Sequence, residues 1–367
     1  MGGPHSIIVR PPYLETMPGI DMEWMRDKLP MLIAFLLLAS LGVLSGCAVE
    51  LDQTAVQSAP SVERFPQNPI VHPEMLPGDD GENINGPSLI RVPDWVEDAL
   101  GRYYLYFAHH RGKYIRMAYA EDLAGPWKIY EPGTLRLDDT ICDDIDTTKA
   151  SYVVHKHVAS PDVHVDPESR QIRMYFHCPM YFPGPQGNGG GYTQISLVAT
   201  SSDGLSFEAG SEVLGNSYFR VFQWAGHYYA MSRPGVFYRS EDGLSGFEEG
   251  PTLFSANMRH SAVAIRDGKL LVLYTMIGDR PERILLSEIE LSPDWMTWTA
   301  TEPVVLLEPE FEWEGANLTL EPSARGHVME PVRQLRDPAF FDTYGRVYML
   351  YSAAGESGIA IAELRWH

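Results

Sequence analysis

The sequence predicts an all-β fold, a five-bladed β-propeller, and three observations lead to this prediction. Short runs rich in aromatic and β-branched residues alternate with turns that contain Gly or Pro, which is typical of strands joined by hairpins. The stretch from Phe219 to Gly250 shows this pattern most plainly. The ending Ser-x-Asp-Gly-Leu followed by Phe-Glu occurs at residues 201–208 and again at 240–248. Related hairpins also recur along the rest of the chain.

The hairpins divide the chain into five units that begin near residues 85, 159, 218, 259 and 336. One sheet of about four strands cannot bury both of its faces alone, so it needs copies of itself as neighbours. A β-sandwich with repeated hairpins is the alternative, but it does not explain the recurring strand endings. The paired runs outside the central unit are Arg102–Ala108 with Tyr114–Tyr119, Ile172–His177 with Gln194–Thr200, Leu270–Thr275 with Arg283–Ile289, and Val347–Ser352 with Gly358–Leu364.

Length, composition and charge narrow the class of protein. The chain has 367 residues and 44% hydrophobic content, which fits one propeller better than two domains. Its formal net charge is −21 at pH 7. A surface so acidic repels phosphate backbones, which argues against a general nucleic-acid-binding role.

Residues 1–46 are expected to be a signal peptide rather than part of the fold. Arg26 and Lys28 precede an apolar run from Met31 to Leu44, and small residues follow this run. The run is short for a membrane span. The residues before Met22 or Met25 are expected to precede the true start of translation.

The end of the signal, Leu44-Ser45-Gly46-Cys47, resembles the bacterial lipobox. This resemblance implies that Cys47 is lipidated and anchors the protein in the bacterial cell envelope. The alternative is an ordinary signal in which Cys47 is incidental. Residues 47–80 are then expected to form a tether and an N-terminal arm, and residues 81–367 to form the propeller.

Two further cysteines, Cys142 and Cys178, fall in different units. Cysteines of an exported protein can pair, but the spacing does not require it, and we expect buried free thiols. No cluster of Cys or His has zinc-binding spacing, so no metal site is predicted from the residues.

The functional prediction follows from where a propeller displays its loops. The entrances of the channel-lining first strands and the loops between second and third strands share one face, where ligands meet the channel. Charged residues and histidines concentrate at these positions. The expected substrate-binding residues are Arg220, Arg233, Arg259, Arg336, His109, His110, His177 and Tyr218, and the expected catalytic candidates are Asp162, Asp337, Glu282, His260 and Glu330.

Two of the five first-strand entrances, SPDVHV from Ser160 and LRDPAFF from Leu335, resemble those of five-bladed glycoside hydrolases of family 43 and relatives such as family 117. The resemblance covers about residues 80–367. It implies a hydrolase of plant, algal or microbial saccharides that requires no cofactor, although a structural Ca²⁺ can occupy the channel. Asp162 matches the family's acidity-tuning position. The chain departs from the family at the base and acid, offering Asn85 and Ser88 in the first unit and Arg220 in the third.

Glycoside hydrolysis needs a proton donor and a carboxylate that activates water or attacks the sugar. Asp162 and Asp337 are the expected bases, while Glu282, Glu330 or His260 is the expected acid. A carboxyl needs a raised pKa for that role, whereas histidine is already close to the working range. We expect Asp162, Asp337, His260 and the four arginines to converge on one pocket.

The arginines favour an anionic sugar, because guanidinium groups bind carboxylate or sulfate oxygens through two hydrogen bonds. Alternatively, they pair mainly with Asp162, Asp337 and Glu330 and hold these acids of the site in place. Two rival functions remain open, a non-catalytic carbohydrate-binding propeller and polysaccharide elimination by the His and Arg groups. A hydrolase should hold two carboxyls, or a carboxyl and a histidine, facing each other across one pocket.

Overall fold

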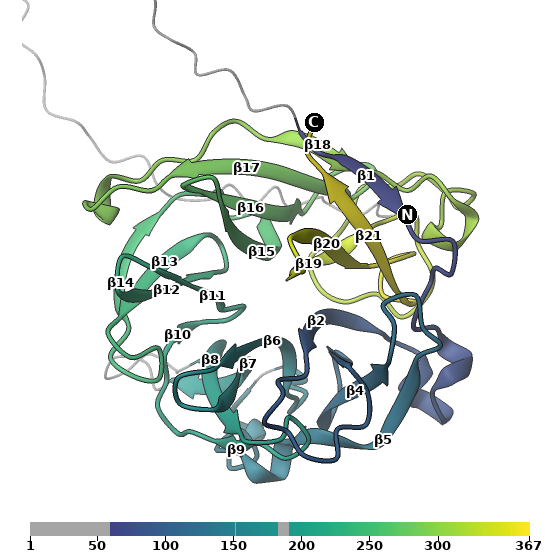
Figure 1. Cartoon of the computed structure of the whole chain (residues 1–367). Coiled ribbons are helices and arrows are strands. Elements are labelled where there is room, and N and C mark those ends of the chain that lie inside the picture. Colours follow the sequence, from purple (N-terminus) through teal and green to yellow (C-terminus); the bar gives the residue numbers. More distant parts are fainter. Residues whose placement is uncertain (1–58, 151, 183–190) are drawn as a thin grey trace, which may run out of the picture. The chain divides into compact units, whose positions relative to one another are not determined.

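Five antiparallel sheets surround a common centre (Figure 1). The computed structural model describes residues 59–367 apart from 151 and 183–190. Strands dominate these residues, and their helical segments are 3-10 turns of three or four residues. No helix in the described part of the chain is long and apolar enough to cross a membrane. The prediction of an all-β, five-bladed propeller is confirmed.

Each sheet starts at the centre and runs outward in chain order, so its first strand lines the channel. The five innermost strands begin at or next to the predicted unit starts. The sheets consist of β2 (Asn85–Arg91), β3 (Tyr103–Ala108), β4 (Tyr114–Ala120) and β5 (Lys128–Arg136); β6 (Ala159–Asp166), β7 (Gln171–Phe182) and β8 (Gly191–Ser201) with the short β9 (Glu208–Ala209) and β10 (Gly215–Asn216); β11 (Arg220–Trp224), β12 (His227–Ser232), β13 (Val236–Ser240) and β14 (Glu248–Thr252); β15 (Met258–Arg266), β16 (Lys269–Met276), β17 (Ile284–Glu290) and β18 (Val304–Leu307); and β19 (Arg336–Thr343), β20 (Arg346–Ser352) and β21 (Ile359–Arg365).

The fifth sheet takes its outermost strand from the other end of the propeller. Strand β1 (Ser61–Arg64) pairs antiparallel with β21, and Ser61 lies opposite Arg365. In Figure 1 the purple β1 lies beside the yellow β21. The propeller therefore includes residues 61–64, which corrects the expected boundary at residue 81. The predicted signal peptide and Cys47 lie outside the described residues.

The repeated Ser-x-Asp-Gly-Leu ending joins neighbouring sheets. The Ser201 hydroxyl accepts a hydrogen bond from the Gly204 amide, and Ser240 accepts one from Gly243. Both glycines adopt a left-handed backbone, φ 76° and 72°, in which glycine carries no steric cost. The carbonyl of Gly204 accepts a hydrogen bond from Tyr106 in the first sheet at 2.9 Å. The carbonyl of Gly243 accepts one from Tyr175 in the second sheet at 2.7 Å. The repeat is thus a turn that docks the second blade onto the first and the third blade onto the second.

The entrances of the five inner strands share one backbone feature. Each contains a residue with positive φ, and four of the strands show a shift of register at this point. Such β-bulges redirect a side chain at the end of a strand. The five residues are Gly86 (φ 60°), Ser160 (49°), Tyr218 (67°), His260 (52°) and Asp337 (46°). The fold therefore turns one residue from each blade out of the regular alternation, at the end of the channel where the site lies.

Candidate functional site

A cavity of about 460 Å³ lies at the entrances of the inner strands. Its walls come from loops of four blades and from the segment that precedes β6. Among the described residues, no aspartate or glutamate lines this cavity. The polar lining consists mainly of histidines and arginines, namely His110, His155, His157, His260, His327, Arg233, Arg259 and Arg325, together with Tyr218 and Gln194. In a chain of net charge −21, this lining is suited to an anion.

His260 and Asp337 form a close pair beneath this cavity. His260 lines the cavity but is only 3% exposed, and its Nε2 lies 3.9 Å from Asp337 Oδ1. This oxygen is buried and has no hydrogen-bond partner, while Oδ2 accepts a bond from Ser352 at 3.4 Å. A buried polar atom without a partner is costly and points to a role outside structural stability. Asp337 Oδ1 is placed to stabilise a proton on His260 Nε2.

Neighbouring hydrogen bonds fix the tautomer of His260. The Thr275 hydroxyl donates its single proton to Glu282 at 2.6 Å. Its oxygen is therefore left to accept a proton from His260 Nδ1, which lies 3.2 Å away. With the proton on Nδ1, the lone pair is on Nε2. Burial lowers the pKa of His260, so the imidazole is neutral near pH 7 and can act as a base.

His110 lines the same cavity in the opposite electrostatic environment. Its Nδ1 lies 2.7 Å from a carboxylate oxygen of Glu356, a residue whose side chain is fully buried. Burial opposes the charged form of His110, but the Glu356 carboxylate and, more weakly, Asp337 outweigh it and raise its pKa. With Nδ1 bonded to Glu356, Nε2 is the nitrogen available to a ligand. His110 is therefore placed to donate a proton.

Two carboxylates and two arginines form a buried network behind the cavity. Glu282 accepts hydrogen bonds from Arg259 at 2.8 and 2.5 Å, and its carboxylate lies 3.3 Å from Arg336. Arg336 also donates to Glu356 at 2.7 Å and is itself fully buried. Burial opposes ionisation of Glu282, but its contacts with His260, Arg259 and Arg336 prevail and lower its pKa.

The network changes the roles expected for two of its members. Glu282 is ionised and inaccessible, so the structure contradicts its predicted role as a proton donor. Arg336 is also inaccessible, because its guanidinium is used by Gln334 and the two glutamates, and it cannot bind substrate. Arg259 and Arg336 do pair with buried acids, but with Glu282 and Glu356 rather than with Asp162, Asp337 and Glu330, the partners that the alternative interpretation named.

Arg233 and Arg325 differ from the paired arginines. Both line the cavity, and neither has a carboxylate within salt-bridge distance among the described residues. Arg233 is partly buried, and its Nε has no hydrogen-bond partner there. Arg325 is exposed. Two guanidinium groups without a protein counter-charge are thus presented to whatever enters the cavity.

Asp162 and Arg220 lie elsewhere, which corrects the expectation of a single pocket. Both line a separate cavity of about 310 Å³ between the inner strands. Asp162 accepts hydrogen bonds from His164 at 2.7 Å and from the Val221 amide at 2.8 Å. Burial opposes its ionisation, but His164, Arg220 and the Val221 amide lower its pKa. Asp162 therefore holds adjacent inner strands together and does not face Asp337.

The Arg220 side chain binds the channel wall. Its guanidinium donates to the carbonyls of Ser261 at 2.7 Å, Ser160 and Phe219 at 3.2 Å, and Pro161 at 3.3 Å. Arg220 is 3% exposed and has no free donor directed at the mouth cavity. These carbonyl oxygens already bind a fixed cation, so the residues present do not fit the channel Ca²⁺ that the resemblance implies.

Three other predicted residues are also outside the cavity lining. His177 is 1% exposed, and its ring packs 4.7 Å from Tyr218. His109 accepts a hydrogen bond from the Arg111 amide, and burial lowers its pKa to about 4. Glu330 is exposed in the loop before β19 and does not reach the cavity. His177 supports the wall behind Tyr218, whereas His109 and Glu330 have no place in the site.

Sequence reasoning missed part of the cavity wall. His155 and His157 lie in the segment before β6, outside the strand entrances that were considered. Arg325 and His327 lie in the long loop between the fourth and fifth sheets, which also carries Glu330, one of the expected catalytic candidates. What could have identified these two residues is the position of their loop, between two blades and next to the entrance of β19, rather than the carboxylates that the loop carries.

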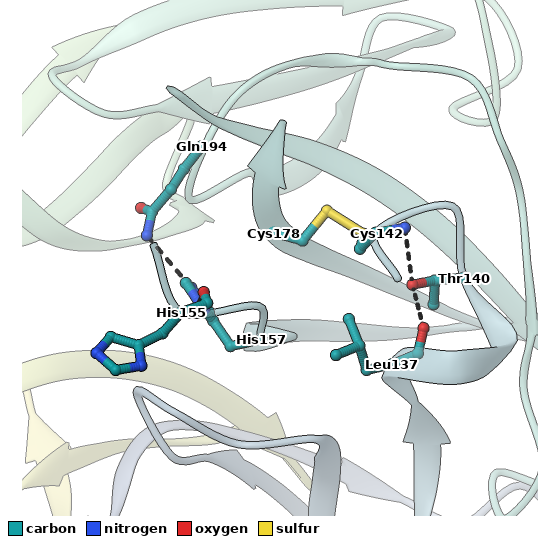
Figure 2. Close-up of a disulfide and its surroundings, with 7 residues drawn as sticks. All are labelled: Leu137, Thr140, Cys142, His155, His157, Cys178 and Gln194. Carbon is teal, nitrogen blue, oxygen red and sulfur yellow. Dashed lines mark hydrogen bonds between the residues drawn. A yellow bond between two sulfur atoms is a disulfide. The ribbon is translucent and has the colours of Figure 1, made fainter. Parts of the chain in front are cut away.

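A disulfide holds the segment that carries His157, contrary to the expectation of free thiols. Cys142 bonds to Cys178 on β7, because the segment between the first two sheets folds back over the second. The His157 ring also contacts Gln194 of the adjoining β8 at 3.3 Å. Figure 2 shows both links on one side of the segment, with the His155 ring pointing away from the disulfide. The β7–β8 hairpin thus fixes this part of the cavity wall.

The chain matches no protein-family model. It is 38% identical over 332 residues to uncharacterized protein R118 of Acanthamoeba polyphaga mimivirus, covering 83% of this chain and 90% of that protein. The chain belongs to the R118 family. Members of the R118 family therefore share this propeller over most of their length.

Solved structures resemble this R118-family chain in fold. A glycosyl hydrolase from Bacteroides ovatus superposes with a TM-score of 0.56 and 9% identity, covering 83% of this chain and 94% of that one. A putative glycoside hydrolase from Parabacteroides distasonis gives 0.56 and 10%, with 84% and 97% covered. At such identities the likeness shows the fold alone, and the activity has to be argued from the site.

Proposed function

We propose that the chain cleaves glycosidic linkages of an acidic saccharide that binds in the mouth cavity. One observation carries the proposal: two histidines line the same cavity, one held against a carboxylate and the other with its Nε2 lone pair free. Pairs of titratable groups whose surroundings push their pKa values apart are typical of acid and base catalysts. The fold shared with glycoside hydrolases supports a saccharide as the substrate.

In this proposal His110, as the imidazolium, donates a proton to the leaving glycosidic oxygen. His260 accepts a proton through Nε2, and Asp337 stabilises the imidazolium that forms. Glu282 and Thr275 orient His260 by holding its Nδ1 proton. The five groups come from three blades, which explains why no short stretch of sequence contains the site.

Arg233 and Arg325 are the proposed anion-binding groups. A carboxylate or sulfate on the sugar would supply the counter-charge that these two arginines lack among the described residues, and a guanidinium fork binds either group with two hydrogen bonds. The ring of Tyr218, which lines the cavity beside His260, offers an apolar face to a sugar.

The second candidate is a saccharide-binding propeller without catalysis. It is favoured by the absence of any carboxyl from the cavity lining in the part of the chain that the structure describes. Incubation of the protein with acidic and neutral oligosaccharides, followed by mass spectrometry, separates the two candidates. Cleavage of acidic substrates is expected. Binding without new products would favour the non-catalytic function.

Arg233→Ala tests the anion site. We expect KM for an acidic oligosaccharide to rise about 10-fold or more with a small change in kcat, because the lost contact acts before and during the reaction alike. KM for a neutral oligosaccharide should not change. Arg239→Ala, at a partly exposed position of the same blade paired with Glu248, is the matched control. Equal effects of both variants on the acidic substrate would contradict the assignment.

We further propose that the protein is exported and anchored in the cell envelope through Cys47. The Cys142–Cys178 disulfide supports an oxidising compartment. Cys47→Ala is expected to move the protein from the membrane fraction to the soluble fraction and to abolish labelling with a fatty-acid probe. Unchanged membrane attachment would show that Cys47 is incidental.

A further inference from the structure

We propose that the mouth cavity cleaves its substrate by β-elimination, and that the substrate is a saccharide containing a uronate whose C4 carries the glycosidic oxygen. This inference rests on the proposed function, because it assumes that an acidic saccharide is cleaved at this site. It adds the reaction type and the position of the charge relative to the broken bond. The charges of the lining residues carry it.

Hydrolysis and elimination make opposite demands on the charges around the substrate. The transition state of glycoside hydrolysis resembles an oxocarbenium ion and gains positive charge at the sugar ring. Elimination removes the proton next to the carboxylate and gains negative charge, as an enolate. Preorganised positive groups stabilise developing enolates and destabilise cations. The cavity lining holds Arg233, Arg259 and Arg325 and no carboxylate among the described residues, which favours the anionic transition state.

The three arginines differ in whether a carboxylate of the protein neutralises their charge. Arg259 is neutralised by Glu282 at 2.8 and 2.5 Å, whereas Arg233 and Arg325 have no carboxylate partner among the described residues. The positive charge available to a bound uronate therefore comes mainly from Arg233 and Arg325 on the cavity wall. The buried Asp337 lies beneath His260 rather than against the ligand, so its charge assists the base without repelling the carboxylate.

The proton transfers use the two histidines. His260 Nε2 takes the proton from C5 of the uronate, and the C5–H electron pair becomes the second bond between C4 and C5. The C4–O4 bond breaks with its electron pair on O4, which receives a proton from His110. One saccharide gives two products without consuming water. The enzyme returns to its starting state when the proton on His260 reaches His110 through solvent.

The orientation of each histidine supports these roles. The Nδ1 proton of His260 is directed to Thr275 at 3.2 Å, which leaves Nε2 as the acceptor. Asp337 Oδ1, without a partner and 3.9 Å away, can bind the new Nε2 proton. His110 is held through Nδ1 by Glu356 at 2.7 Å, which leaves Nε2 for the leaving oxygen.

The test incubates the full chain with C4-linked oligouronates in water enriched in oxygen-18. Elimination predicts fragments that include an unsaturated uronate with ultraviolet absorbance and without the heavy oxygen. His260→Gln is expected to reduce the initial rate at least 100-fold. His227→Gln, at a partly exposed histidine that begins β12 and does not line the mouth cavity, should leave the rate unchanged. Thermal unfolding and binding of the uncleaved oligouronate confirm that each variant is folded.

Each outcome decides the inference. Saturated fragments that carry oxygen-18 would overturn elimination and leave cleavage of an acidic saccharide standing. Cleavage of neutral oligosaccharides alone, or no cleavage of any saccharide, would overturn the proposed function together with this inference. Unsaturated products formed by the wild type and by His260→Gln at equal rates would keep elimination but overturn His260 as its base.

Discussion

His260→Gln is expected to lower kcat by roughly 10²–10⁴ while changing KM little, because general-base catalysis contributes about this factor and acts mainly in the transition state. The glutamine amide occupies roughly the position of Nε2 of the imidazole, but it cannot accept a proton there as Nε2 does. Initial rates and binding of an uncleaved substrate analogue measure the two effects separately.

Asp337→Asn provides the companion measurement. An asparagine of the same shape leaves Nε2 of His260 in place but removes the negative charge that stabilises its imidazolium. We expect a smaller loss of kcat than for His260→Gln, with binding retained. A wild-type rate in His260→Gln would exclude this histidine as the base, and a loss of binding in both variants would mean that the pair only shapes the cavity.

Glu356→Gln is expected to displace the alkaline limb of the pH–rate profile toward lower pH. The profile requires neutral His260 and protonated His110. Burial lowers the pKa of His260 below its ordinary 6.5, while Glu356 and Asp337 raise that of His110 above 6.5. Removing the Glu356 charge lowers the pKa of His110, so the rate declines at lower pH. The acid limb, set by His260, should move less.

The same substitution should lower the free energy of unfolding by roughly 3–5 kcal/mol, because it leaves the partly buried His110 without its carboxylate partner and removes one of the two carboxylates that face the buried Arg336. The interaction between Glu356 and His110 contributes its full stabilisation between about pH 4.5 and about pH 6.5. In this window both groups are charged in the folded chain and in the unfolded chain. The stabilisation is lost as pH rises through the raised pKa of His110 or falls through the lowered pKa of Glu356.

Denaturant unfolding at pH 6 and at pH 9 measures this dependence. Glu248→Gln, which removes an exposed carboxylate 3.5 Å from Arg239, is the matched control and should change stability by less than about 1 kcal/mol. A destabilisation of Glu356→Gln that is equally large at both pH values would show that His110 is not a charged partner.

The fold could be predicted because it is repetitive. Alternating strands and turns mark each blade, and the Ser-x-Asp-Gly-Leu ending has a local cause, since its serine, aspartate and glycine build one turn. The closing strand Ser61–Arg64 could not be found in this way. It is one short strand separated from its blade by most of the chain, and its partner β21 is not its neighbour in sequence.

The site was predicted in part. His110, His260, Arg233, Arg259 and Tyr218 were placed at the mouth because their positions in the repeat put them there. What the sequence could not reveal is the direction of each side chain. Within one entrance, Ser160 has a positive φ that breaks the regular alternation of side chains, and Asp162, two residues later, lines the channel cavity rather than the mouth. The sequence also does not reveal which charged side chains pair with each other, since Glu282 contacts Arg336 across more than 50 residues of chain.

The pairing of β1 with β21 has a consequence for the synthesis of the protein. Ser61 and Arg365 are 304 residues apart in sequence, so the ring cannot close until almost the whole chain has left the ribosome. Joining ends this distant carries a chain-entropy cost of about 5 kcal/mol beyond a constant, and contacts of such long range form slowly. A chain that ends before β21 lacks the partner of β1 and leaves the edge of β20 unpaired. Premature termination therefore yields an open, aggregation-prone ring rather than a smaller propeller.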